Sequence, residues 1–210
     1  MQRGLSKTTF RSHVRAVWFA YGADLNKWIQ FIRDNERNPG STVIFVQVTS
    51  VEEALVAIND WKVDVVVAQG SEILYFMCGL SHFNFILGIE GGGHGAASGL
   101  PLLTLVSSIL SAVPLEISPP ILAAGGMVNG GHLAALLTMG ASGAAFGTRF
   151  LLSPESLYTD VQRQALLAAS SYSSVRTMAF DHARGTLGWP QGIDGRGLHN
   201  SKCFQVARRY

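Results

Sequence analysis

The 210-residue sequence contains only two cysteines and shows no concentration of basic charge. Cys78 and Cys203 are far apart and lack the spacing of metal ligands, which favours a reducing, intracellular setting. The 16 basic and 14 acidic residues are scattered and leave a net charge of +2. They form no basic stripe that could follow the phosphate backbone of a nucleic acid. We therefore expect a cytoplasmic protein that has no nucleic-acid partner.

The amino terminus lacks a secretory signal and has no acidic residue before position 16. Its basic residues, Arg3, Lys7, Arg11 and Arg15, are not followed by the apolar core that such a signal requires. A basic, acid-free start with Ser and Thr fits either a mitochondrial presequence or a truncated gene start. The composition, 48% hydrophobic and 14% charged, suffices for the core of one domain over residues 1–210.

Short β-rich apolar runs alternate with segments of helical periodicity from Arg15 onward. This alternation predicts βα units around a parallel sheet whose strands are buried on both faces. Ser50 or Thr49 is expected to cap the second helix, and Gly140 suits the end of the fourth. The predicted strands cover residues 16–20, 42–48, 63–68, 120–124, 143–146 and 174–179, and the predicted helices cover residues 24–34, 51–59, 101–112, 131–139 and 154–169.

The glycine turn of a dinucleotide-binding fold is also missing. Such an open, doubly wound sheet requires G-x-G-x-x-G directly after its first strand. Here the glycine clusters follow the third and fourth predicted strands, with different spacing. A (β/α)8 TIM barrel carries its ligands on the loops after its strands. We therefore predict an α/β protein with a TIM-barrel fold that is incomplete, since about six strands are found where a barrel has eight.

One aromatic segment, residues 71–88, has neither helical nor strand periodicity and interrupts the loop after the third predicted strand. It is short for a bilayer core and contains His82 and Asn84. We interpret it as an insertion that arose from an error in the gene model, such as a retained short intron. The alternatives are a lid over a ligand site and a membrane span. No membrane association is expected.

The first candidate site combines Gln69-Gly70 with the later run Gly91-Gly92-Gly93-His94-Gly95. Glycines let a backbone approach a flat ring closely. Gln69 ends a predicted strand and is suited to hydrogen-bond the polar edge of a flavin or substrate. Histidine is the usual general base at neutral pH, so His94 is a candidate catalyst. Taken alone, a histidine in such a loop is more often a structural hydrogen-bonding residue.

The second candidate site consists of Gly125-Gly126 and, about twenty residues later, Gly147-Thr148. Each pair follows a predicted strand. In a barrel, the loops after two neighbouring late strands can direct backbone N–H groups at one phosphate. The spacing favours the interpretation that the two pairs share one phosphate site. The alternative is that these glycines only form tight turns.

Several short motifs in a fixed order resemble those of nitronate monooxygenases, formerly called 2-nitropropane dioxygenases, particularly the fungal ones. The similarity extends from about residue 15 to residue 200. The motifs are Ala16-Val17-Trp18-Phe19, Gln47-Val48, Ala68-Gln69-Gly70, Gly92-Gly93-His94-Gly95, Ala123-Ala124-Gly125-Gly126, Gly147-Thr148-Arg149-Phe150, Gly188-Trp189-Pro190 and Gly195-Arg196-Gly197.

The resemblance implies an FMN-dependent oxidoreductase, a flavoprotein in which FMN lies across the barrel mouth. The two glycine loops would hold the FMN phosphate, and the earlier loops would lie near the isoalloxazine ring or ribityl chain. The phosphate residues are Gly125, Gly126, Gly147 and Thr148; the residues near the ring are Gln69, Gly70 and Gly92, with Gln47 a weaker candidate.

The family's catalytic histidine corresponds to His94. By resemblance, this residue would take the α-proton of a neutral nitroalkane or assist nitronate binding beside the flavin. Together with dioxygen, the reaction would give a carbonyl compound and nitrite, with the redox chemistry belonging to the cofactor. The implied partners are therefore a nitronate or nitroalkane and dioxygen.

Three features depart from the family pattern. The family joins Gln-Gly to Gly-Gly-His through two or three residues, and removing residues 71–88 or 73–90 restores that spacing here. The first strands of the family are missing, about two βα units of the eight in a barrel. An open sheet edge and exposed apolar surface are therefore expected. The stretch after Asn200 also does not continue as the family does.

Other functions remain open at this stage. A different FMN barrel, such as an enoyl-reductase-like enzyme, would use the same phosphate site. An inosine-monophosphate-dehydrogenase-like enzyme would need a catalytic cysteine, and Cys78 lies in the insertion. A noncatalytic, truncated product that binds a phosphorylated ligand is the third possibility. No metal site is expected, and Asp181, His182 and Asp194 are interpreted as solvated loop residues.

Overall fold

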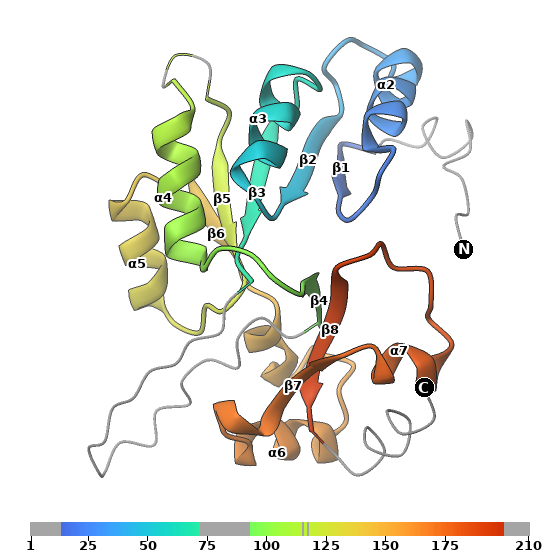
Figure 1. Ribbon diagram of the computed structural model, residues 1–210, viewed down its shortest axis with the longest axis vertical. Coiled ribbons are helices and arrows are strands. Elements are labelled where there is room, and N and C mark those ends of the chain that lie inside the picture. The colour runs from blue at the N-terminus through green and yellow to red at the C-terminus, as the bar shows by residue number, and fades with distance from the viewer. Residues whose placement is uncertain (1–13, 72–92, 115, 117, 200–210) are drawn as a thin grey trace.

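The structure, a computed structural model, describes residues 14–71, 93–114, 116 and 118–199. It contains a five-stranded sheet flanked by helices and, near one end of that sheet, a smaller three-stranded sheet (Figure 1). The insertion predicted at residues 71–88 lies outside the described residues from position 72 onward. Gly92 and the carboxyl-terminal stretch after Asn200 also lie outside them.

The larger sheet is entirely parallel and follows the order β1-β2-β3-β5-β6. Neighbouring strands are therefore consecutive members of this sheet along the chain. Its strands are β1 (Ala16–Phe19), β2 (Val43–Val48), β3 (Val65–Gln69), β5 (Ile121–Ala124) and β6 (Gly143–Ala145).

Four helices connect these strands, and two of them begin at side-chain caps that the sequence supplies. The Ser50 side chain accepts a hydrogen bond from the Glu53 backbone N–H, and Asn129 does the same for His132. Such caps satisfy backbone donors that a helix start leaves unpaired. Gly140, with φ of +106°, follows the end of the fourth helix as expected. The helices are α2 (Leu25–Asn35), α3 (Val51–Asn59), α4 (Leu102–Ala112) and α5 (Gly130–Thr138).

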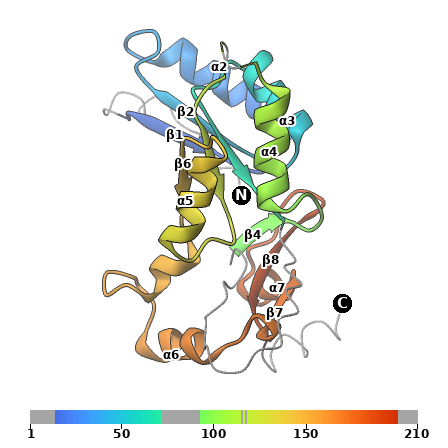
Figure 2. The same ribbon diagram turned by 90° about the vertical axis from the view of Figure 1, so that its left-hand side faces the viewer.

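The two faces of the parallel sheet differ in burial. Alternate residues of β2 on one face, Ile44, Val46 and Val48, are fully buried in the core. Helices α3 and α4 pack along this face, as both views show (Figure 1; Figure 2). The other face carries Phe45 and Gln47, which are only partly buried. Because strand side chains alternate between faces, the second face is open at β2, although Val67 of the central strand β3, which shares that face by register, is fully buried.

This strand order and layering define the barrel type. A doubly wound sheet reverses its strand order part-way and carries helices on both faces, whereas here the order never reverses. The TIM-barrel assignment is confirmed. Within the described residues, β1 and β6 each pair with one neighbour only, and Trp18 and Val43 are 46% and 38% exposed. The expected open edges and exposed apolar surface are therefore present.

The smaller sheet is antiparallel, with the order β4-β8-β7. It comprises β4 (Gly93–Ala96), β7 (Ser174–Thr177) and β8 (Ile193–Leu198). The elements around it are the 3-10 helices η1 (Thr148–Leu152) and η2 (Ser171–Ser173) and the helices α6 (Asp160–Ala168) and α7 (Ala179–Arg184).

Two predictions about this region are wrong. The strand expected at 174–179 exists, but it pairs antiparallel with β8 and does not join the parallel sheet. The helix expected from residue 154 begins at Asp160, because Thr159 and Gln162 form a capping box that starts it there. Strands β4 and β8 were not predicted, since their glycine-rich sequences carry no apolar alternation.

Candidate functional site

A cavity of about 320 Å³ lies at the carboxyl ends of the parallel strands. This volume falls within the range of small-molecule sites, about 300–1,000 Å³. The cavity lies on the open face of the sheet because the strand residues that line it share that face by register. Six of its lining residues were predicted as cofactor ligands, namely Gln47, Gln69, Gly125, Gly126, Gly147 and Thr148.

Both glycine loops of the predicted phosphate site reach this one cavity. Gly125 and Gly126 have φ of +94° and +66°, a left-handed conformation that side chains rarely adopt. At Gly147 an added Cβ would meet no atom within 4 Å, so the backbone there borders open space. The structure therefore brings the two loops together, as their spacing predicted.

Polar side chains that line the same cavity belong to a network centred on Gln69. The Gln47 amide Nε2 donates to Gln69 Oε1 at 2.8 Å, and Gln69 Nε2 donates to the His94 carbonyl at 3.2 Å. The Tyr21 hydroxyl lies within hydrogen-bonding distance of Gln69 Oε1 and of the His94 carbonyl, at 2.7 Å from the latter. It has one proton to donate to these two oxygens. The network fixes the Gln47 and Gln69 amides at the cavity wall.

Tyr21 connects this network to the aromatic residues beyond it. Burial raises the pKa of the Tyr21 hydroxyl, while hydrogen bonds with Gln69 and Gln47 and the charge of Arg176 act in the opposite direction. Tyr21 also has φ of +55°, which is uncommon for a bulky residue, and its ring meets that of Trp189 edge-on at 6.0 Å. Because its pKa is raised, the Tyr21 phenol is neutral at physiological pH.

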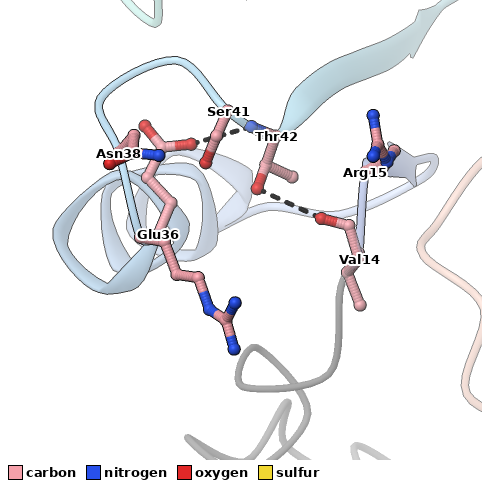
Figure 3. A pocket seen from close by; sticks show the side chains of 7 residues that line it. Val14, Arg15, Glu36, Asn38, Ser41 and Thr42 are labelled. Atoms are coloured by element: carbon pink, nitrogen blue, oxygen red, sulfur yellow. Dashed lines mark hydrogen bonds between the residues drawn. The ribbon is translucent and has the colours of Figure 1, made fainter.

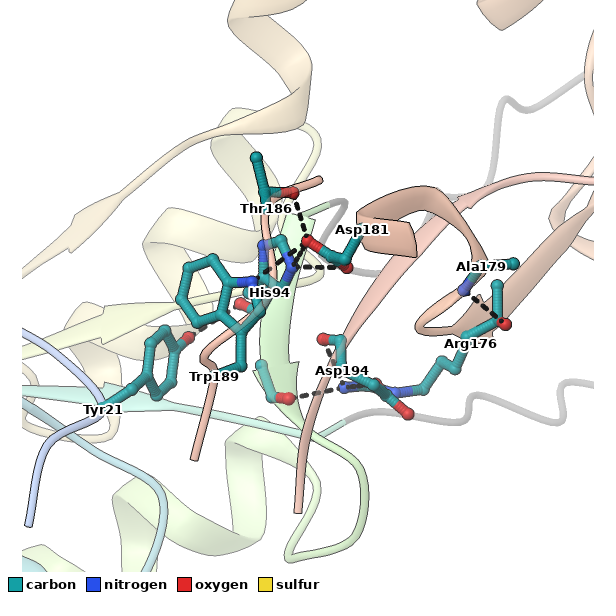
Figure 4. Close-up of polar contacts among 10 residues, drawn as sticks. Tyr21, His94, Arg176, Ala179, Asp181, Thr186, Trp189 and Asp194 are labelled. Carbon is teal, nitrogen blue, oxygen red and sulfur yellow. Dashed lines mark hydrogen bonds and ion pairs between the residues drawn. The ribbon is translucent and has the colours of Figure 1, made fainter. Parts of the chain in front are cut away.

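The His94 side chain belongs to a second polar cluster, next to the cavity (Figure 4). Its Nε2 lies 2.9 and 3.0 Å from the two carboxylate oxygens of Asp181. The Trp189 ring stacks on the imidazole with centroids 3.7 Å apart. His94 is joined to the cavity-lining residues through its backbone carbonyl, which accepts from Gln69.

Asp181 is the buried centre of this cluster, at 1% exposure. Its Oδ1 also accepts hydrogen bonds from Thr186 Oγ1 at 2.9 Å and Trp189 Nε1 at 3.0 Å. Burial alone would raise the pKa of this carboxyl, but the hydrogen bonds from His94, Thr186 and Trp189 outweigh it and hold the pKa below its usual value. Asp181 is therefore a carboxylate at neutral pH.

The earlier interpretation of Asp181 and Asp194 as solvated is wrong. Asp181 is buried against His94, and Asp194 pairs with the guanidinium of Arg176. Arg176 also donates to the Gly95 carbonyl at 2.7 Å, and so ties β7 and β8 to β4. A sequence signal for the cluster did exist, because Trp189 lies within the Gly188-Trp189-Pro190 motif. Nothing in the sequence paired it with Asp181.

Gly70, which was also predicted to lie near the flavin, has a different position. Gly70 does not line the cavity but lies behind it, where its carbonyl would be 3.4 Å from a Cβ on Gly125. A Cβ on Gly70 itself would overlap the first residue of α4. Its role is therefore close packing of β3 against α4.

A second pocket of about 280 Å³ lies at the amino ends of β1 and β2, lined by Val14, Arg15 and Thr42 among others (Figure 3). Its carboxylate, Glu36, accepts the Gly40 and Thr42 backbone N–H groups at 2.6 and 3.0 Å. Those hydrogen bonds close the loop between α2 and β2, so the carboxylate of this pocket is used by the fold itself.

The residues that the structure describes contain no group of three or more His, Cys, Asp or Glu side chains that could hold a metal ion. None of the helices among them has the length and apolar character needed to cross a bilayer.

The fold is thus that of a barrel-type α/β protein with a cavity at the carboxyl ends of its parallel strands. Comparison with known proteins agrees. The family model for nitronate monooxygenase matches residues 84–187. A protein of Metarhizium robertsii named nitronate monooxygenase npaC is 36% identical over 185 residues, which cover 85% of this chain and 45% of the relative. The chain belongs to the nitronate monooxygenase family.

Two solved structures are similar to this one. Nitroalkane oxidase from Streptomyces ansochromogenes matches with a TM-score of 0.66 and 27% identity, covering 94% of this chain and 49% of that one. FabK from Thermotoga maritima matches with a TM-score of 0.69 and 24% identity, covering 96% and 52%. The latter similarity concerns the fold alone. The chain spans about half the length of the relatives it matches.

Proposed function

We propose that this chain forms the FMN site of a flavin-dependent oxidoreductase that oxidises nitronates or nitroalkanes to carbonyl compounds and nitrite, with dioxygen as the co-substrate. The observation that carries the proposal is the convergence of the two glycine loops and the Gln47–Gln69 pair on one cavity. Family membership and the names of the fungal and Streptomyces relatives support the substrate class.

The residues around the cavity fit FMN. Gly125, Gly126 and Gly147 carry no side chain that would keep a phosphate from the backbone N–H groups. Gln47 Oε1, which accepts from Trp18 Nε1, has a second lone pair, and Gln69 Nε2, which donates to the His94 carbonyl, has a second N–H; these two groups would meet the hydrogen-bonding edge of a flavin ring. FMN, when bound, supplies the redox chemistry of the reaction.

The protein's own groups would bind and orient the substrate and move one proton. His94 is the candidate general base for a neutral nitroalkane, since it is the one histidine joined to this site in the described part of the chain. The α C–H bond would break, its proton would pass to the imidazole, and the electron pair would remain on the nitro group as the nitronate. A nitronate substrate arrives without that proton and does not need the base.

Cofactor binding is tested first, by titrating the full chain with FMN and following flavin fluorescence. A Gly147→Leu variant should weaken binding at least tenfold, because Gly147 lines the cavity and a side chain there would fill it. Gly130→Leu is the matched control: Gly130 is exposed, also has no atom within 4 Å of an added Cβ, and lies outside the cavity lining. A chain lacking residues 71–88 is titrated in parallel to test the insertion.

Turnover is then measured as nitrite released from a nitroalkane and from its nitronate. Failure of both the full and shortened chains to bind FMN would overturn the cofactor assignment. FMN binding without nitrite release from either compound would overturn the substrate assignment and favour another FMN barrel activity.

A further inference from the structure

We propose that Asp181 is a positioning residue that holds His94 in a single tautomer, with the proton on Nε2, and thereby makes Nδ1 the nitrogen that accepts the substrate proton. The inference rests on the proposed function in one respect only, that His94 removes a proton. The tautomer itself follows from contacts within the chain.

The hydrogen bond between His94 and Asp181 has a fixed direction. An ionised carboxylate can only accept, and both oxygens of Asp181 lie within 3.0 Å of His94 Nε2. The hydrogen must therefore be on Nε2. In a neutral imidazole the other nitrogen then carries the lone pair. Among the described residues, no hydrogen bond occupies Nδ1.

Hydrogen-bond donors keep Asp181 ionised and hold it in place. The carboxylate is buried at 1% exposure, yet three donors converge on it, from His94, Thr186 and Trp189. Charge-assisted hydrogen bonds of this kind are roughly twice as strong as neutral ones. Asp181 lies on α7, and the Thr186 and Trp189 donors follow it in the next eight residues, so one short segment builds the complete carboxylate site.

Trp189 and Asp181 together fix the orientation of the His94 imidazole ring. Trp189 stacks on His94 at an interplanar angle of 16° and donates its indole N–H to Asp181 Oδ1, one of the two oxygens next to His94 Nε2 (Figure 4). Stacking on one face and the hydrogen bond at one edge together restrict rotation about both side-chain torsions of His94. A base held in this way spends little entropy in reaching its reactive orientation.

The tautomer is measured directly by long-range ¹H–¹⁵N correlation NMR of ¹⁵N-histidine-labelled full chain, at a pH well above the ordinary histidine pKa of about 6.5. A His94→Gln variant assigns the signals. The expected wild-type result is a protonated Nε2 and an unprotonated Nδ1. An Nδ1-protonated ring would overturn the inference whether or not the chain binds FMN, which separates its failure from failure of the proposed function.

Two variants test the cause. Asp181→Asn should give a mixture of tautomers, because an amide can both donate and accept. Thr186→Val is the matched control, since it removes another hydrogen bond to Asp181 and leaves the pair with His94 intact; it should retain the wild-type tautomer. An Asp181→Asn spectrum identical to wild type would refute the role of Asp181.

Turnover of FMN-loaded protein adds a readout that loss of structure alone would not give. Asp181→Asn should lower kcat for a neutral nitroalkane at least tenfold and leave the turnover of the nitronate within about twofold, because only the former needs the base. Equal losses on both substrates would contradict a role in proton transfer.

Discussion

Substituting Gly70 by alanine should weaken the fold more than any exposed glycine substitution, because β3 ends directly against the start of α4. A Cβ at position 70 would lie 2.5, 2.6 and 2.7 Å from the N, Cα and Cβ atoms of Leu102. Carbon contacts settle near 3.5 Å, so the two backbones must separate by about 1 Å. Backbone cannot rotate away as a flexible side chain would.

The magnitude follows from what α4 contributes. Its residues Leu102, Leu105, Val106 and Ile109 are buried at 3% exposure or less. A gap of about 0.5–1 Å forfeits a quarter to a half of a packing contact, and overpacking costs about 1–3 kcal/mol. With four buried side chains affected, we expect a loss in the free energy of unfolding near the upper end, about 3 kcal/mol.

Urea denaturation followed by circular dichroism measures this loss. With a slope of about 1–3 kcal/mol per molar urea, the midpoint should fall by about 1–3 M. Gly130→Ala is the control: it starts a helix, is exposed and meets no atom, so it should leave stability unchanged or raise it by up to about 1 kcal/mol. Coincident midpoints for Gly70→Ala and wild type would show that β3 and α4 do not approach as closely as described.

Two further outcomes test the helix cap and the buried carboxylate. Ser50→Ala removes the acceptor for the Glu53 N–H and should lower the free energy of unfolding by about 1 kcal/mol in the same assay, whereas an unchanged midpoint would refute the cap. The pKa of Asp181 is lowered in the folded state, so its contribution to stability is present above the unfolded value of about 3.9 and is lost as the pH falls through the folded value. Asp181→Asn should therefore be less stable than wild type at pH 7 and lose less of its stability in acid; parallel acid profiles would contradict this.

The parallel sheet and most of the cavity could be predicted from the sequence. The signals there are local: short apolar runs alternate with helical segments, Ser50 and Asn129 cap two of the helices, and consecutive strands pair with one another. Because the carboxyl ends of parallel strands meet at one edge of the sheet, Gly125 and Gly147 could be assigned to one phosphate site before any distance was known. Gln69 was joined to that site through the family resemblance.

The environment of His94 could not be predicted from the sequence, because it depends on contacts that form in the folded chain. Its partner Asp181 is 87 positions away in the chain, and the strands that bring them together are short and glycine-rich, as in Gly93–Ala96. Such strands have no apolar alternation because they bury little side chain, and their pairing is antiparallel and distant in sequence. A buried carboxylate and a solvated one have the same letter in a sequence; the difference lies in the three donors that converge on it in the folded chain.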